Sequence, residues 1–147
     1  MTALSAALPA GWAQRLGYAG LLPFVLLAMV TWMTEPGHRG VAVLALTSYG
    51  AVIASFLGAI HWGLVMRDAS KQSLALLGWG VTPSLLAWVA LMLSPPVGLL
   101  MIAAVLWMCF AVDRQVYPRF QAQGWLPMRL ALTCIASASC VAGAARL

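Results

Sequence analysis

Charged residues are the scarcest class in this sequence, and their scarcity already excludes most kinds of protein. Only 7% of the residues are Asp, Glu, Lys or Arg, whereas an ordinary soluble domain has about 25%. So few charged side chains cannot cover the surface of a water-soluble globular protein, which is where such side chains normally lie. The chain is also 63% hydrophobic, with a mean hydropathy of +0.94. We therefore expect a membrane protein.

Long stretches of the chain contain no Asp, Glu, Lys or Arg at all. These stretches are residues 16–34, 40–66, 72–112 and 130–145. A helix needs about 20 apolar residues to cross the ~30 Å hydrocarbon core of a bilayer. The third stretch is long enough for two helices, and Pro95-Pro96 near its middle predicts a tight hairpin, because proline starts a helix better than it continues one.

The expected fold is all-α, a polytopic membrane protein with a bundle of five transmembrane helices. Their predicted bounds are about 16–34, 41–66, 73–93, 96–112 and 128–145. The last helix is short, so four spans plus one interfacial helix remain an alternative. Residues 1–147 are predicted to form a single integral membrane domain, with 1–15 as a short cytoplasmic segment. The connection 113–127 is too short to build a soluble active site.

Lysine and arginine predict the orientation, because short cytoplasmic loops carry an excess of them. Six of the eight lie on the N-terminal side of the five-helix arrangement: Arg15, Arg67, Lys71, Arg114, Arg119 and Arg129. Only Arg39 and Arg146 lie on the other side. We expect a cytoplasmic N-terminus and an external C-terminus, and the Ala- and Leu-rich composition suits a bacterial inner membrane. These basic residues are dispersed, so nucleic acid is not an expected partner.

The sequence lacks the residues that several kinds of catalysis and transport require. Apart from Arg129 at the start of the last one, none of the predicted spans contains Asp, Glu, Lys or Arg, which argues against a proton pump or an ion-coupled transporter. Ser-His-Asp sets, HExxH motifs and P-loops are absent, so we predict a protein that is not an enzyme. The three cysteines are Cys109, Cys134 and Cys140, with no CxxC pair, so neither a metal site nor a disulfide framework is expected.

The predicted helix 41–66 carries the most informative pattern. Gly50, Ala54 and Gly58 recur every four residues and form a small-residue seam, and such seams let helix backbones approach closely. His61 continues the seam, so it is expected to face a neighbouring helix as a neutral imidazole. Three interpretations remain open: a hydrogen bond to a carbonyl, hydroxyl or water, a small-molecule site such as a quinone headgroup site, and a haem ligand. The only other histidine, His38, lies in a loop on the opposite side.

Other residues extend this candidate site and the candidate interfaces. Pro23 and Pro83 are expected to kink their helices, and Thr82 or Ser84 to satisfy the carbonyl freed by Pro83. The small residues of 133–144 predict a helix enclosed by its neighbours or covered by another protein. The candidate small-molecule or partner site comprises Tyr49, Ser55, His61, Trp62 and Trp79. Lipid or partner contacts at the cytoplasmic interface are predicted for Arg67, Lys71, Arg114, Arg119, Trp125 and Arg129.

The chain also resembles a known family of small membrane proteins, those similar to transmembrane protein 69. The resemblance covers nearly all of the chain from Pro23 onward and includes Tyr49 and SFLGAIHWG at 55–63, of which His61-Trp62-Gly63 is the most specific part. It continues through 79–83, Trp88, Asp113 and 125–133. The family is a domain of unknown function, so the resemblance implies an architecture and assigns no catalytic or binding residue. Its mitochondrial members imply, by analogy, an energy-transducing membrane.

Two functions follow as hypotheses. The first is a non-enzymatic accessory or assembly subunit of a larger membrane complex, such as a respiratory one, with lipids and other membrane subunits as partners. The second is a membrane protein that binds a quinone, haem or lipid around His61. The first needs no cofactor. Mild-detergent purification separates the two hypotheses, because one predicts a bound protein and the other a bound small molecule.

Overall fold

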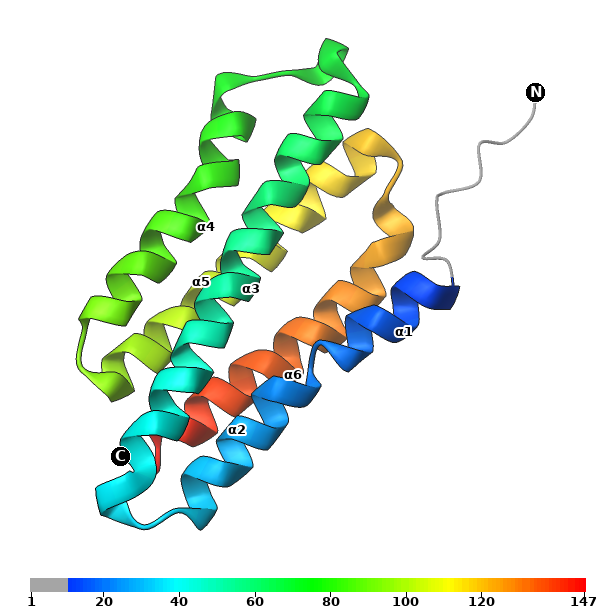
Figure 1. The fold of residues 1–147 in the computed structure, drawn as a ribbon. Helices are drawn as coiled ribbons and strands as arrows, with labels where there is room; N and C mark the ends of the chain where they lie inside the picture. The colour runs from blue at the N-terminus through cyan, green and yellow to red at the C-terminus, as the bar shows by residue number, and fades with distance from the viewer. Residues whose placement is uncertain (1–10) are drawn as a thin grey trace.

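The computed structural model describes residues 11–147, and these form a helical bundle (Figure 1). Five helical segments in this range are long and apolar enough to cross a membrane, as the sequence predicts. Residues 1–10 of the predicted cytoplasmic segment 1–15 lie outside the described residues. The helices are α1 (Gly11–Ala19), α2 (Leu22–Met33), α3 (Arg39–Arg67), α4 (Leu74–Met92), α5 (Pro95–Val116) and α6 (Leu126–Ala144). Short 3-10 helices lie at Pro36–His38, Ala69–Lys71, Tyr117–Phe120 and Gln123–Trp125.

The first span, Gly11–Met33, is longer than predicted and is interrupted. It begins before residue 16, and the break between α1 and α2 falls at Gly20 and Leu21, just ahead of Pro23. Proline at the start of α2 cannot donate a backbone hydrogen bond back into α1, which is the reason for the expected kink. The hydroxyl of Tyr49 on α3 donates a 2.8 Å hydrogen bond to the carbonyl of Gly20. A side chain from α3 therefore stabilises the break.

The small-residue seam faces protein along its length, on the central and longest helix, α3. A Cβ atom at Gly50 would lie 2.6 Å from Cγ2 of Ile102 on α5. Ala54 is fully buried, and a Cβ atom at Gly58 would overlap the backbone carbonyl oxygen of Gly80 on α4. The expectation that this seam faces neighbouring helices is confirmed, and the neighbours change from α5 to α4 along it.

Helix α4 continues past Pro83 without a break. The hydroxyl of Thr82 donates to the carbonyl of Gly78 at 2.9 Å, one residue before Trp79, whose carbonyl Pro83 frees. The indole Nε1 of Trp62 on α3 donates to the carbonyl of Leu77 at 3.0 Å. The expectation that Thr82 or Ser84 satisfies the carbonyl freed by Pro83 is therefore wrong, because the side-chain donors that reach α4 here bond to the carbonyls of Gly78 and Leu77.

The two C-terminal helices form a hairpin in which α6 packs against α5 and α2. The predicted turn before α5 is confirmed, with Pro95 and Pro96 in its first turn. The prediction that α5 ends at residue 112 is wrong, because the helix continues to Val116. The last span, Gln123–Ala144, is full length, so the alternative of four spans is not needed. Several small residues of α6 are buried, namely Ala136, Ser137, Ser139, Cys140 and Gly143.

The connections of the bundle fall at two ends (Figure 1). One end carries the start of α1 and the α3–α4 and α5–α6 connections, and the other carries the α2–α3 and α4–α5 connections and the C-terminus. At this second end Arg39 is buried, and its Nη1 donates to the carbonyl of Arg146 at 3.0 Å. Trp32 donates to the carbonyl of Ala142 at 2.9 Å. The C-terminal backbone is therefore anchored to α2 and α3.

Candidate functional site

Asp113 is a buried carboxylate inside the bundle, with 1% of its surface exposed. The prediction that the spans contain no Asp, Glu, Lys or Arg is therefore wrong. The uncharged run in the sequence stops at residue 112, but the helix does not, since the backbone hydrogen bonds of α5 continue to Val116. Asp113 consequently lies one turn inside α5, on its packed face.

Arg129 provides the counter-charge on α6. Its Nε donates a 2.8 Å hydrogen bond to Oδ2 of Asp113, and only 7% of its side chain is exposed. The prediction that Arg129 points outward toward lipid or a partner at the interface is wrong. Helix α6 already begins at Leu126, so Arg129 lies on its first turn against α5. A guanidinium can be buried there because a carboxylate faces it, whereas an unpaired charge would be strongly disfavoured.

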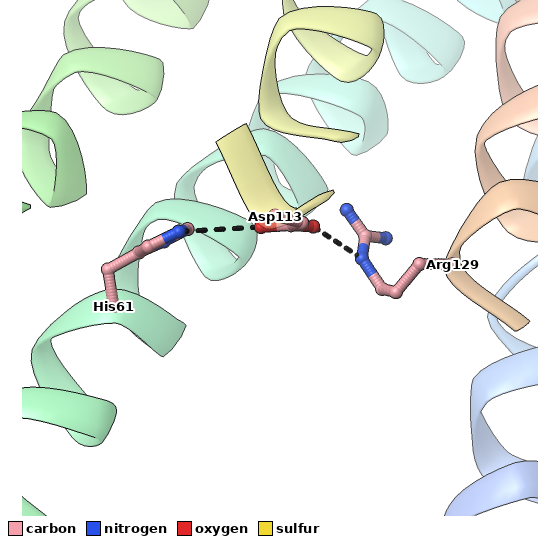
Figure 2. Close-up of polar contacts among 3 residues, drawn as sticks. All are labelled: His61, Asp113 and Arg129. Carbon is pink, nitrogen blue, oxygen red and sulfur yellow. Dashed lines mark hydrogen bonds and ion pairs between the residues drawn. The ribbon is translucent and has the colours of Figure 1, made fainter. Parts of the chain in front are cut away.

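His61 completes the cluster from α3, as Figure 2 shows. Its side chain is fully buried, and its Nε2 lies 3.4 Å from Oδ1 of Asp113. The orientation of the two groups does not make this a hydrogen bond, so the contact is electrostatic. The expectation that His61 points into the protein is confirmed, but the group beside it is a carboxylate on α5 rather than a carbonyl, hydroxyl or water. Asp113 thus lies between a histidine and an arginine, and three helices meet at it.

Several buried polar atoms around the cluster lack a hydrogen-bond partner among residues 11–147. They are both ring nitrogens of His61, Oδ1 of Asp113, Nη2 of Arg129, Oγ1 of Thr133 and Nε1 of Trp79. More than about nine in ten buried polar groups in proteins have a partner, either in the protein or in ordered water. Arg129 and Thr133 lie one turn apart on α6, so their unpartnered groups are close to each other.

A cavity of about 610 Å³ lies directly beside Arg129 and Thr133. Its wall comes from α1, α2, α3, α5 and α6, and most of the wall is apolar. The polar side chains in the wall are Arg67, Tyr117, Arg129 and Thr133. Ligand pockets of about 300–1,000 Å³ with an apolar wall and a few convergent polar groups are typical small-molecule sites.

The cavity is polar toward one end and apolar toward the other. Arg67, Tyr117 and Trp125 lie near the bundle end that carries the α3–α4 and α5–α6 connections. Phe24, Ile53 and Ala136 line the part deeper in the bundle. This arrangement matches a molecule with a polar head near the membrane interface and an apolar body in the hydrocarbon region.

The residues predicted as one small-molecule site do not gather in one place. Tyr49 contacts Gly20, Ser55 donates to the carbonyl of Ala51 at 2.9 Å within α3, and Trp62 contacts α4. Trp79 packs against the core from α4. Neither these residues nor His61 belong to the cavity wall.

Sequence reasoning missed Asp113, Tyr117 and Thr133 as site residues, and it assigned Arg129 to contacts with lipid or a partner at the interface. One feature of the sequence could have pointed to this site, because Asp113 is the only acidic residue after Asp68. Asp113 balances an arginine, Arg129. For Asp68 the partner is a lysine, Lys71, at 2.9 Å. The hydroxyl of Ser70 and then the ammonium of Lys71 lower the pKa of Asp68 below its ordinary value.

The predicted interface residues divide into two groups. Lys71, Arg114 and Arg119 are exposed at the same end of the bundle. Arg67 and Trp125 belong to the cavity wall, and Nη2 of Arg67 donates to the carbonyl of Phe120 at 2.6 Å. Among residues 11–147, His, Cys, Asp and Glu side chains do not gather in groups of three or more.

Comparisons with known proteins show the family to which this chain belongs. The family model described as protein of unknown function (DUF3429) matches residues 10–145. Transmembrane protein 69 of Xenopus tropicalis is 40% identical over 82 residues, which cover 54% of this chain and 32% of the relative. Transmembrane protein 69 of Mus musculus is 27% identical over 128 residues, which cover 84% of this chain and 51% of the relative. The chain thus spans between a third and a half of these relatives. No solved structure matches it.

Proposed function

The chain belongs to the DUF3429 family, and we propose that it is a non-enzymatic membrane protein that binds a small lipophilic molecule in the cavity beside Arg129. One observation carries this proposal: the wall of the 610 Å³ apolar cavity includes Arg129 and Thr133, and each of these residues has a buried side-chain donor without a partner among the described residues. A bound molecule with an acceptor oxygen would satisfy both groups, and its apolar part would fill the rest of the space.

The side chains around the cavity favour entry from the bilayer. Leu16 on α1 and Phe56 on α3 belong to its wall, and 70% and 62% of their surfaces are exposed. Both are apolar, so they suit contact with lipid tails. A molecule that reaches the cavity between α1 and α3 therefore travels through the hydrocarbon region, as a quinone or a lipid does.

Haem suits this cavity less well than a quinone or a lipid does. His61 is fully buried against Asp113 and does not belong to the cavity wall, and His38 is exposed at the other end of α3. A quinone or a lipid needs hydrogen-bond donors rather than an axial ligand, and the wall supplies donors. Binding is favoured over catalysis because both oxygens of Asp113, the one buried acid among residues 11–147, already face His61 and Arg129.

The proposal is tested by blocking the cavity. Ile53→Trp places a large ring at the cavity wall, and Val52→Trp is the matched control, because Val52 is 64% exposed on the same helix and lies outside the wall. Each protein is purified in mild detergent, and bound small molecules are extracted and identified by mass spectrometry. We expect one class of lipophilic molecule with the unmodified protein and Val52→Trp, and its loss from Ile53→Trp. Equal recovery from all three proteins would contradict the proposal.

A second candidate function is the accessory or assembly subunit of a larger, for example respiratory, membrane complex. The observation that favours it is an open apolar groove of about 590 Å³ between α2 and α6, whose wall includes the small residues Ala28, Cys134, Ala138 and Ala142. Small residues allow a partner helix to approach closely. Cys134 is exposed in this groove, so cross-linking from its thiol in native membranes tests for a neighbouring subunit. Recovery of lipid adducts alone would argue against such a partner.

The proposed location is a bacterial inner membrane with a cytoplasmic N-terminus. The exposed cations Arg15, Lys71, Arg114 and Arg119 lie on the side of the bundle where α1 begins. At the other end, Arg39 is turned into the protein to hold the C-terminal backbone. The excess of exposed cations at one end supports the proposed orientation.

A further inference from the structure

The charges around the cavity do not balance. Asp113 compensates Arg129 through its 2.8 Å hydrogen bond. Of the other two acidic residues, Asp68 pairs with Lys71, and Glu35 lies in the α2–α3 connection at the opposite end. Arg67 also lines the cavity, and its one hydrogen bond among the described residues goes to the uncharged carbonyl of Phe120. The polar end of the cavity therefore carries one positive charge without a carboxylate partner.

We propose that the ligand of this cavity is a single-chain lipid with an anionic head, a carboxylate or a phosphate, bound by Arg67, Arg129 and Thr133. This inference rests on the proposed function and specifies its ligand. Arg67 is exposed at the edge of the apolar space, so its guanidinium can form a charge-assisted hydrogen bond with an anionic head, whereas a neutral head offers it no opposite charge.

The donors available match an oxyanion. Arginine carries five N–H donors in a planar fork that suits carboxylate and phosphate oxygens. Arg129 uses its Nε for Asp113, and its buried Nη2 has no partner among residues 11–147. The buried hydroxyl of Thr133, one turn further along α6, is also without a partner there. Arg129 is thus already oriented by Asp113, so little side-chain entropy is lost when the head binds.

The apolar end suits one hydrocarbon chain. Phe24, Ile53, Leu106 and Ala136 line it and present no charged group. The head then lies near Trp125 and Arg67, at the depth where aromatic and basic side chains meet lipid headgroups. A single-chain lipid in this position keeps the orientation that it has in a bilayer leaflet.

The inference is tested with three probes that share one alkyl chain: the fatty acid, the alkyl phosphate and the uncharged fatty alcohol. Equilibrium binding of each is measured to the full chain in an uncharged detergent. We expect both anionic probes to bind at least about tenfold more tightly than the alcohol, a difference of about 1.4 kcal/mol. The tighter of the two anionic probes identifies the head as carboxylate or phosphate.

Arg67→Gln is the main variant, because Arg67 is exposed and its loss leaves the buried ion pair intact. It should remove most of the preference for the anionic probes, and Thr133→Val should weaken binding of both. Arg119→Gln is the matched control, since Arg119 is an exposed cation at the same end outside the cavity wall.

The outcomes test the anionic head and the binding in the cavity separately. Equal affinity for all three probes would overturn the anionic head and leave the proposed cavity binding standing. An equal loss of preference in Arg119→Gln would also overturn it, because general surface charge would then explain the result. Failure of the unmodified protein to bind any probe would overturn both the proposed function and this inference.

Discussion

The Nε of Arg129 donates a 2.8 Å hydrogen bond to Oδ2 of Asp113, although the two residues are 16 positions apart and lie on different helices. The bond joins α5 to α6 just inside the connection between them. His61, with its Nε2 3.4 Å from the other oxygen, brings α3 to the same carboxylate. Asp113 therefore links three helices, and the buried charge of Arg129 depends on it for compensation.

Replacing Asp113 by Asn should destabilise the protein strongly. Arg129 would remain buried without a counter-charge, and breaking a buried pair in this way costs about 3–5 kcal/mol. Thermal unfolding in detergent can be followed with a thiol-reactive dye, because Cys109 and Cys140 are buried and react on unfolding. The exposed Cys134 is first changed to Ser to remove its background signal.

Two further variants control this experiment. Asp68→Asn removes a solvent-exposed pair and should change stability by less than about 1 kcal/mol. The double variant Asp113→Asn with Arg129→Gln should recover much of the loss, since no charge is then left unpaired. A double variant no more stable than Asp113→Asn alone would show that the guanidinium is not the cause.

Gly58→Leu should destabilise the bundle, and Gly58→Ala should do so to a smaller extent. A Cβ atom at Gly58 overlaps the carbonyl oxygen of Gly80, so α3 and α4 must separate at a cost of about 1–3 kcal/mol. The matched control is Gly63→Ala on the same helix, where an added Cβ meets nothing within 4 Å. That change should be neutral or stabilising by up to about 1 kcal/mol. Equal melting temperatures for the Gly58 and Gly63 alanine variants would refute close packing at this seam.

His61→Gln should keep the protein folded with a loss of only about 1 kcal/mol, because the Gln amide can donate to Asp113. His61→Leu should cost more, since Oδ1 of Asp113 then faces a hydrocarbon. Because His61 does not line the cavity, binding of a cavity ligand should survive the Gln substitution. Loss of binding with an unchanged melting temperature would instead place the ligand at His61.

The orientation can be tested with reporters fused after Leu147. We expect an alkaline phosphatase fusion to be active and a green fluorescent protein fusion expressed in bacteria to be dark, because the exposed cations gather at the opposite end of the bundle. The reverse pattern would place the C-terminus in the cytoplasm and overturn the proposed orientation.

The spans could be predicted from the sequence because each is defined by a local property. Runs without charge and a pair of prolines locate the helices, and the Gly50–Gly58 spacing identifies a packed face of α3. The end of α5 could not be found in this way. A charged residue such as Asp113 usually marks the edge of a span, and only the presence of Arg129 on a neighbouring helix lets the helix continue with its carboxylate buried.

The candidate site was predicted less well, for a related reason. Three residues look like site residues in the sequence, but each donates to a backbone carbonyl instead. Tyr49 and Trp62 thereby join α3 to neighbouring segments, and Ser55 bonds within α3 itself. The cavity depends on how α1, α2, α3, α5 and α6 are arranged in space, because residues of all five line it. Such spacing between helices is a tertiary property, and no periodicity within a single helix encodes it.

The pairing of Asp113 with Arg129 also bears on how the chain enters the membrane during synthesis. An unpaired charge raises the free energy of inserting a single helix, by about 2.5–3.5 kcal/mol at the bilayer centre. Only residues 117–125 separate α5 from α6, so both charges emerge close together in time. Insertion of α5 alone would leave Asp113 without its partner, whereas insertion of both helices together brings in a pair with no net charge. The ion pair therefore makes the α5–α6 hairpin, rather than the single helix, the favoured unit of translocon release.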